Sequence, residues 1–100
     1  MRFTTSLGFL RDLHGIRVNC IVPDWIATEY RLGWLARLPE EVRAAKAVPA
    51  APTTPEQFAA AVVDLSLREQ YSGRVLLCRS GQPLEFVKHG DPGYRRLEPY

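Results

Sequence analysis

The sequence contains few of the residues that build metal and nucleophile sites, with only two cysteines and two histidines in 100 residues. Cys20 and Cys78 lie about sixty residues apart in apolar runs, and His14 and His89 do not supply the close ligand spacing of a zinc site. We therefore expect no metal site and two buried, reduced thiols.

Long hydrophobic runs are also absent. No apolar stretch approaches the roughly 20 residues that a membrane-spanning helix needs. The segment MRFTTSLGFLRDL, residues 1–13, is too short for a secretory signal peptide. Its charged residues also occur too early, and one of them is an aspartate. We expect a cytoplasmic protein.

Lysine is scarce, because eleven of the thirteen basic residues are arginines, and these are scattered along the chain. The net charge is +2, and no basic stripe with interleaved aromatic residues occurs, which argues against nucleic-acid binding. A composition of 46% hydrophobic and 24% charged residues is ordinary for a globular chain. The length fits one modest domain or part of a larger one.

The first half of the chain predicts a helix, a buried strand and a lid. Apolar residues at helical spacing favour a helix over 5–13. Residues 16–22, IRVNCIV, are apolar at both odd and even positions, which is typical of a parallel strand covered on both faces. Pro23 should end this strand, because proline cannot donate to a central ladder. An aromatic-rich lid follows, and Pro39 then opens a helix that runs through Lys46.

The second half predicts a capped helix and a second strand. Thr54, Pro55 and Gln57 form a capping-box pattern at the start of a helix that ends near Arg68. Residues 74–78 form an apolar strand, and residues 86–100 are expected to be an irregular tail.

The predicted order is therefore helix, strand, lid, helix, strand, which indicates a parallel α/β unit. The strand over residues 16–22 is too apolar for a sheet edge. It should have a neighbouring strand that this chain does not contain.

Two segments resemble a known family. Residues 15–19, GIRVN, followed by Pro23-x-x-Ile26-x-Thr28, resemble the sixth strand and following loop of the short-chain dehydrogenases/reductases. Residues 54–63 and 72–83 are similar to the last helix and seventh strand of that family. The similarity covers residues 3–85. It implies an α/β fold that is the C-terminal part of a doubly wound, Rossmann-like parallel sheet and is incomplete on its own.

The resemblance also implies a cofactor and a reaction. The family binds NAD or NADP and moves a hydride between the nicotinamide and an alcohol or carbonyl, at the carboxyl ends of the strands. By resemblance, Pro23 packs beside the nicotinamide ring, while the backbone of Ile26 and the hydroxyl of Thr28 face its carboxamide. A hydroxyl suits an amide because it can both donate and accept a hydrogen bond.

The same loop carries the candidate substrate contacts Asp24, Trp25 and Tyr30. Asp24 stands where the family usually has glycine, and its alternative role is that of a plain turn residue. Trp25 and Tyr30, together with Trp34, could instead form an aromatic lid or contact the core.

Neither catalytic signature of the family occurs. The sequence has no glycine-rich phosphate-binding turn, and no tyrosine is followed four residues later by lysine. No catalytic residue is assigned, and two hypotheses follow. The chain is the C-terminal part of an oxidoreductase, inactive alone and completed by a missing N-terminal half, or it is a non-catalytic interaction module that docks on itself or on a full-length relative.

Overall fold

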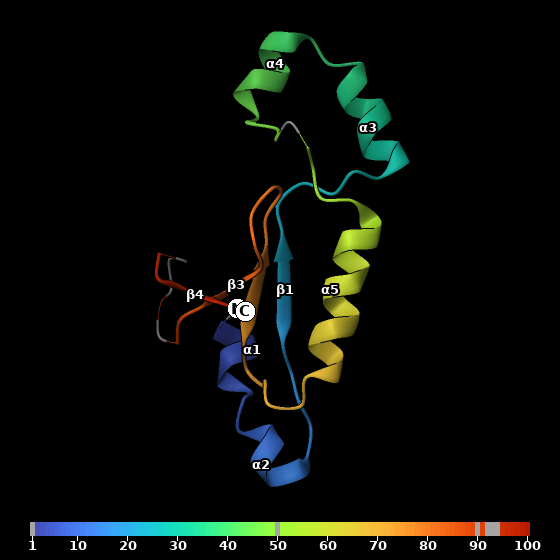
Figure 1. Ribbon diagram of the computed structural model, residues 1–100. Coiled ribbons are helices and arrows are strands. Elements are labelled where there is room, and N and C mark those ends of the chain that lie inside the picture. The colour runs from blue at the N-terminus through green and yellow to red at the C-terminus, as the bar shows by residue number, and fades with distance from the viewer. Residues whose placement is uncertain (1, 50, 90, 92–94) are drawn as a thin grey trace.

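The computed structural model describes residues 2–49, 51–89, 91 and 95–100. Helices precede and follow the first strand, and the last three elements are strands (Figure 1). Their bounds are α1 Arg2–Ser6, α2 Leu10–His14, β1 Cys20–Pro23, α3 Glu29–Ala36, α4 Glu40–Ala45, α5 Pro55–Leu67, β2 Val75–Cys78, β3 Glu85–Val87 and β4 Leu97–Pro99.

The strands form one open sheet in the order β1-β2-β3-β4. β1 and β2 are parallel, whereas β3 and β4 pair in antiparallel fashion. The α/β class and the order helix, strand, lid, helix, strand are confirmed. The sheet itself is mixed, so the prediction of a wholly parallel sheet is wrong for this chain, because β3 and β4 add a meander that the sequence pattern did not reveal.

β1 is an edge strand. The amide of Cys20 donates to the carbonyl of Arg74 at 2.9 Å, so the backbone polar groups of Cys20 face β2. In a parallel ladder alternate residues face alternate neighbours, so the backbone groups of Asn19 and Ile21 face the open edge. Within the described residues, no hydrogen bond engages the backbone of Ile21 on that side. Pro23 ends β1 as expected.

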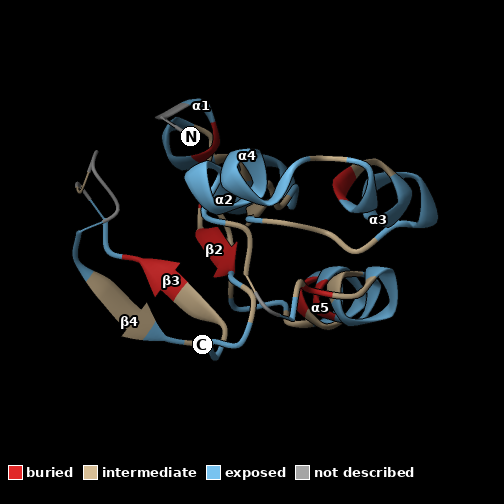
Figure 2. Ribbon diagram, turned by 90° about the horizontal axis from the view of Figure 1, so that it is seen from above, coloured by how far each residue is buried: buried red, intermediate tan, exposed pale blue. Residues whose placement is uncertain are grey.

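The core lies on both faces of the sheet. On the face covered by α5, Leu76 and Phe86 are fully buried and pack with Leu65 of the helix. On the other face, Val75, Leu77 and Val87 form a second buried cluster. Figure 2 shows α5 on one side of the sheet and α1 toward the other. The buried residues on the two faces belong to β2, β3 and α5, whereas β1 is only half-buried, so the strand predicted over residues 16–22 is not covered as fully as expected.

The start of α5 is fixed by its capping box. The hydroxyl of Thr54 accepts the amide of Gln57 at 3.1 Å, and the side-chain carbonyl of Gln57 accepts the amide of Thr54 at 2.9 Å. Pro55 occupies the first turn, where a missing amide costs nothing. This reciprocal bonding confirms the predicted beginning of the helix.

The end of α5 is bound by the segment that precedes β1. The guanidinium of Arg17 donates to the carbonyl of Arg68 at 2.8 Å and to that of Ser66 at 2.6 Å, at the helix end where carbonyls lack intrahelical partners. The side-chain Nδ2 of Asn19 donates to the carbonyl of Tyr71 at 3.0 Å, and its side-chain oxygen accepts the backbone amide of Arg74 at 3.1 Å. Residues 16–19 are thus held by the loop after α5, and β1 begins only at Cys20.

The predicted helix over residues 5–13 is divided into α1 and α2. Between them, Gly8 lies against Gly73, where a Cβ would come within 2.8 Å of the Gly8 Cα. Gly73 also has a φ of 70°, which favours glycine. The break permits this backbone contact, and it leaves Phe3 and Leu13 largely exposed.

The prediction that residues 86–100 form an irregular tail is wrong. They complete β3 and contribute β4, although residues 90 and 92–94 of this segment lie outside the described residues. The hydroxyl of Tyr100 donates to Asp64 of α5, and its ring packs edge-on against Phe86 at 5.2 Å. Glu98 of β4 pairs with Arg74. Strands of three residues carry too little alternation to be detected in the sequence.

In the described part of the chain, no helix is both long and apolar enough to span a membrane.

The Tyr100 contacts generate a prediction about alkaline stability. Burial, and then the hydrogen bond to the Asp64 carboxylate, raise the pKa of Tyr100 to about 12. A raised pKa in the folded state stabilises the fold below the ordinary value of 10, and this contribution is lost as pH rises from 10 to about 12. Urea unfolding should show the wild type more stable than Tyr100→Phe at neutral pH, with the difference shrinking above pH 10. A difference that is constant with pH would contradict it.

Candidate functional site

The candidate site lies where the two parallel strands end. Pro23 and Cys78 are register partners, so the loops that follow β1 and β2 leave the sheet at the same edge. In open α/β sheets this carboxyl edge is where ligands bind. Asp24 begins one loop, and Ser80 belongs to the other.

Asp24 and Ser80 join these two loops directly. One carboxylate oxygen of Asp24 accepts the Ser80 hydroxyl at 2.7 Å, and the other accepts the Ser80 amide at 2.9 Å. The first oxygen also accepts the amide of Trp25 at 2.6 Å. Hydrogen bonds to an ionised carboxylate are stronger than those between neutral groups. Asp24 therefore clamps the loop after β2 to the loop after β1.

Thr53 completes the cluster from a third segment. Its amide donates to the Ser80 hydroxyl oxygen at 3.0 Å, and the two hydroxyl oxygens lie 3.3 Å apart. Thr53 also forms an isolated parallel bridge with Ile26, with its carbonyl accepting the amide of Ala27 at 2.8 Å. The residue is buried, so these bonds satisfy groups that water does not reach. We call Asp24, Thr53 and Ser80 the neck cluster.

The electrostatics of the neck cluster favour an ionised carboxylate. Partial burial raises the pKa of Asp24, but the Ser80 amide, the Ser80 hydroxyl and the Trp25 amide together outweigh it, so the pKa lies below its ordinary value. Asp24 is consequently an acceptor of hydrogen bonds and a poor general acid at neutral pH.

Cys78 lies beside the neck cluster with the opposite tendency. Burial raises the pKa of its thiol, the charge of Asp24 raises it further, and a hydrogen bond from Thr53 lowers it in part. The protonated thiol is a weak nucleophile. Both cysteines are free, with Cys78 buried and Cys20 partly so. The expectation of burial holds fully only for Cys78.

The residues assigned by resemblance to the cofactor lie along the loop after β1. Pro23 is the last residue of the strand, and the backbone of Ile26 bridges to Thr53. Thr28 caps α3, since its hydroxyl oxygen accepts the amide of Arg31 at 3.2 Å. The side chain of Thr28 is exposed, and its hydroxyl hydrogen remains able to donate.

The residues assigned to the substrate are not brought together at one point. Asp24 is directed toward Ser80, whereas Tyr30 is 78% exposed on α3. Trp25 instead contacts the lid, where the Arg31 guanidinium lies 5.5 Å from its ring and 5.3 Å from that of Trp34. Lys46 of the following segment lies 5.3 Å from the Trp34 ring. The two tryptophans thus have the aromatic-lid contacts that we gave as their alternative role.

Sequence reasoning missed Ser80 and Thr53. Ser80 follows the second parallel strand, so the rule that such strands end at one edge could have placed it beside Asp24. Thr53 stands next to the helix cap Thr54, and no local pattern distinguishes it.

Two grooves flank α5. One, of about 480 Å³, borders the neck cluster and is lined by residues that include Thr53, Gln57, Cys78, Arg79 and Gln82. The other, of about 500 Å³, follows the open edge of β1 and is lined by Arg17, Asn19, Ile21, Val62, Leu65 and Ser66. Among the described residues, no three His, Cys, Asp or Glu side chains gather as metal ligands would.

Comparison of the sequence with protein-family models and with curated proteins, and of the fold with solved structures, gave no match.

The lowered pKa of Asp24 predicts how the neck cluster responds to acid. A depressed pKa contributes stability above the ordinary value of 3.8, and the contribution is lost as pH falls through the folded-state pKa. Urea unfolding should find Asp24→Asn less stable than the wild type at neutral pH. The gap should begin to close near pH 3.8 and vanish in stronger acid. An unchanged gap in strong acid would contradict the role of the charge.

Proposed function

We propose that this chain is the C-terminal part of an NAD(P)-dependent short-chain dehydrogenase/reductase, the part that supplies the loop facing the nicotinamide and surfaces for subunit contact. The observation that carries the proposal is the parallel pair β1–β2, which releases the loop from Pro23 to Thr28 at its carboxyl edge. A doubly wound, Rossmann-like sheet uses such an edge for a dinucleotide.

Within this proposal the loop binds the nicotinamide half of NAD or NADP. The Thr28 hydroxyl has a hydrogen to donate to the carboxamide, and its exposure leaves it accessible. Pro23 offers an apolar surface to the ring. The substrate, a small alcohol or carbonyl compound, would be approached by the aromatic side chains of Trp25 and Tyr30.

The chain by itself has neither a phosphate cradle nor the Tyr-x-x-x-Lys pair, so the proposal assigns catalysis to another part of the enzyme. The open edge of β1 is the place where that part joins. Among the described residues no hydrogen bond engages the backbone of Asn19 or Ile21 there, and the groove beside them is lined by Val62 and Leu65 together with Arg17 and Ser66. An extended apolar strand fits both features.

Cofactor binding should therefore depend on a complement. NADH or NADPH fluorescence should not change with micromolar concentrations of the chain alone, but should rise when it is mixed with an N-terminal fragment of a short-chain dehydrogenase that carries the glycine-rich turn. Thr28→Val should weaken that binding by about tenfold, the loss of one hydrogen bond, while Thr28→Ser should retain it. Micromolar binding by the chain alone would contradict the proposal.

A second candidate function is a non-catalytic module that docks on itself or on a full-length relative. The observation in its favour is the exposure of large apolar side chains in the segment that precedes β1: Phe3, Phe9, Leu13 and Ile16 are each more than half exposed. Surfaces of this kind mark interaction sites in soluble proteins.

Self-docking through β1 has one natural register. Because Ile21 directs both backbone groups outward, two antiparallel copies would pair Ile21 with Ile21 across a two-fold axis. Asn19 would then oppose Pro23, whose carbonyl accepts but which has no amide to return. The ladder is therefore short.

Edge docking can be tested with one substitution and a matched control. Ile21→Pro removes the outward amide without touching the β1–β2 ladder, whereas Ile21→Val keeps the amide. Light scattering after size exclusion should show association of the wild type and Ile21→Val, and a monomer for Ile21→Pro with an unchanged far-ultraviolet circular dichroism spectrum. A wild-type monomer would reject self-docking and leave only a foreign strand as the occupant of the edge.

A further inference from the structure

Residues 29–49, which contain α3 and α4 and which we call the lid, form a separate unit at one end of the molecule (Figure 1). Leu35 is buried within it, and the guanidinium of Arg43 donates to the Leu35 carbonyl at 2.8 Å. Lys46 and Arg31 both lie against Trp34. Its internal contacts thus join one helix to the other.

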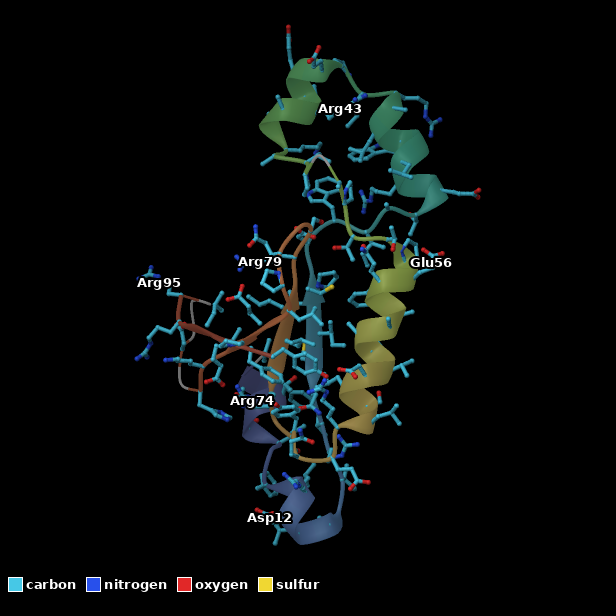
Figure 3. All side chains as sticks on the ribbon, viewed as in Figure 1. Asp12, Arg43, Glu56, Arg74, Arg79 and Arg95 are labelled. Atoms are coloured by element: carbon cyan, nitrogen blue, oxygen red, sulfur yellow. The ribbon has the colours of Figure 1, made fainter. Side chains whose placement is uncertain are left out.

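The lid has little direct connection to the sheet. No hydrogen bond or ion pair in the described ranges joins residues 29–49 to α5 or to the strands. The molecule is elongated, with a radius of gyration of 15.8 Å, whereas a compact chain of this length has about 13 Å. Figure 3 shows the lid side chains, with Arg43 labelled, gathered apart from those around the sheet.

The connection runs through a neck of two chain segments. Ile26 on the outgoing segment bridges to Thr53 on the returning segment. The amide of Ala27 donates to the Thr53 carbonyl at 2.8 Å, and the amide of Thr53 donates to the Trp25 carbonyl at 3.1 Å. These few bonds hold the two segments side by side.

The neck is held to the loop after β2 through Ser80, beside the hydrogen bond from Thr53 to the Cys78 thiol. The Ser80 hydroxyl accepts the amide of Thr53 on the returning segment and donates to Asp24 at the root of the outgoing one. Asp24 in turn holds the Ser80 amide. One hydroxyl and one carboxylate therefore fix both segments of the neck to the loop after β2.

We propose that Asp24 is a positioning residue that, through Ser80, sets the orientation of the lid over the carboxyl edge of the parallel strands. When this anchor is removed, the lid moves as a unit about the bridge between Ile26 and Thr53. Thr28 lies at the base of the lid as the cap of α3, so the anchor also places its hydroxyl. The relevance of that hydroxyl to a cofactor rests on the proposed function, whereas the lid motion does not.

The experiment is amide ¹⁵N relaxation on the full chain and its variants. Ser80→Ala removes the hydroxyl, Asp24→Ala removes the carboxylate, and Ser80→Thr keeps a hydroxyl at the same place. Asp12→Ala, an exposed aspartate on α2 (labelled in Figure 3), is the matched control for loss of a carboxylate. Hydrogen exchange at Ala27 and Thr53 is measured in parallel.

In Ser80→Ala and Asp24→Ala, we expect order parameters to fall together across residues 29–49 while those of α5 and β2 stay at wild-type values. Exchange at Ala27 and Thr53 should quicken by about tenfold or more, because charge-assisted bonds are lost. Ser80→Thr and Asp12→Ala should behave as the wild type.

Two results would overturn the proposal. One is a lid whose order parameters and neck exchange are unchanged in Ser80→Ala and Asp24→Ala. The other is equal loosening of β2, α5 and the lid, which would mean that the cluster supports the whole fold instead of positioning the lid. If Asp24→Ala does not fold, Ser80→Ala and its Ser80→Thr rescue decide between the outcomes. Neither result depends on a cofactor, so they are separable from failure of the proposed function.

Discussion

The parallel pairing of β1 with β2 is the constraint from which the rest of the structure follows. Two parallel strands cannot be joined by a tight turn, so the chain between them must cross over, and here the crossover carries both the lid and α5. With β1 on one side and β3 on the other, β2 is an interior strand, and its Leu76 is fully buried. It also brings Asp24 and Ser80, distant in sequence, to the same edge of the sheet.

Local chemistry made some elements predictable. The capping box at Thr54 specifies the start of α5 without help from distant residues, whereas the run before Pro23 located β1 but not its beginning at Cys20. The break at Gly8 depends on contact with Gly73, and β4 depends on Tyr100 reaching Asp64. Such contacts join segments that are far apart in the chain, so the spacing of apolar residues within one segment cannot predict them. For the same reason, the sequence did not predict that the sheet is mixed.

One part of the candidate site could likewise be predicted from the sequence, and another part could not. The end of β1 at Pro23, from which the loop to Thr28 leaves the sheet, could be predicted because proline cannot continue a central ladder. The partners of Asp24 could not, since Ser80 and Thr53 come from two other segments and are ordinary polar residues in isolation. Asp24 holds the loop after β2 through Ser80, and it is Ser80 that extends the contact to Thr53 on the third segment.

The bridge between Ile26 and Thr53 has a consequence for how the chain tolerates change in length. It closes residues 27–52 into a loop whose two ends are held together by the bridge itself, independently of how the sheet packs. The entropy of closing such a loop grows only with the logarithm of its length, at roughly 0.6 kcal/mol for each doubling. Insertions or deletions between Ile26 and Thr53 therefore change the length of this loop at a small cost in folding free energy. They leave the hydrophobic clusters on the two faces of the sheet unchanged.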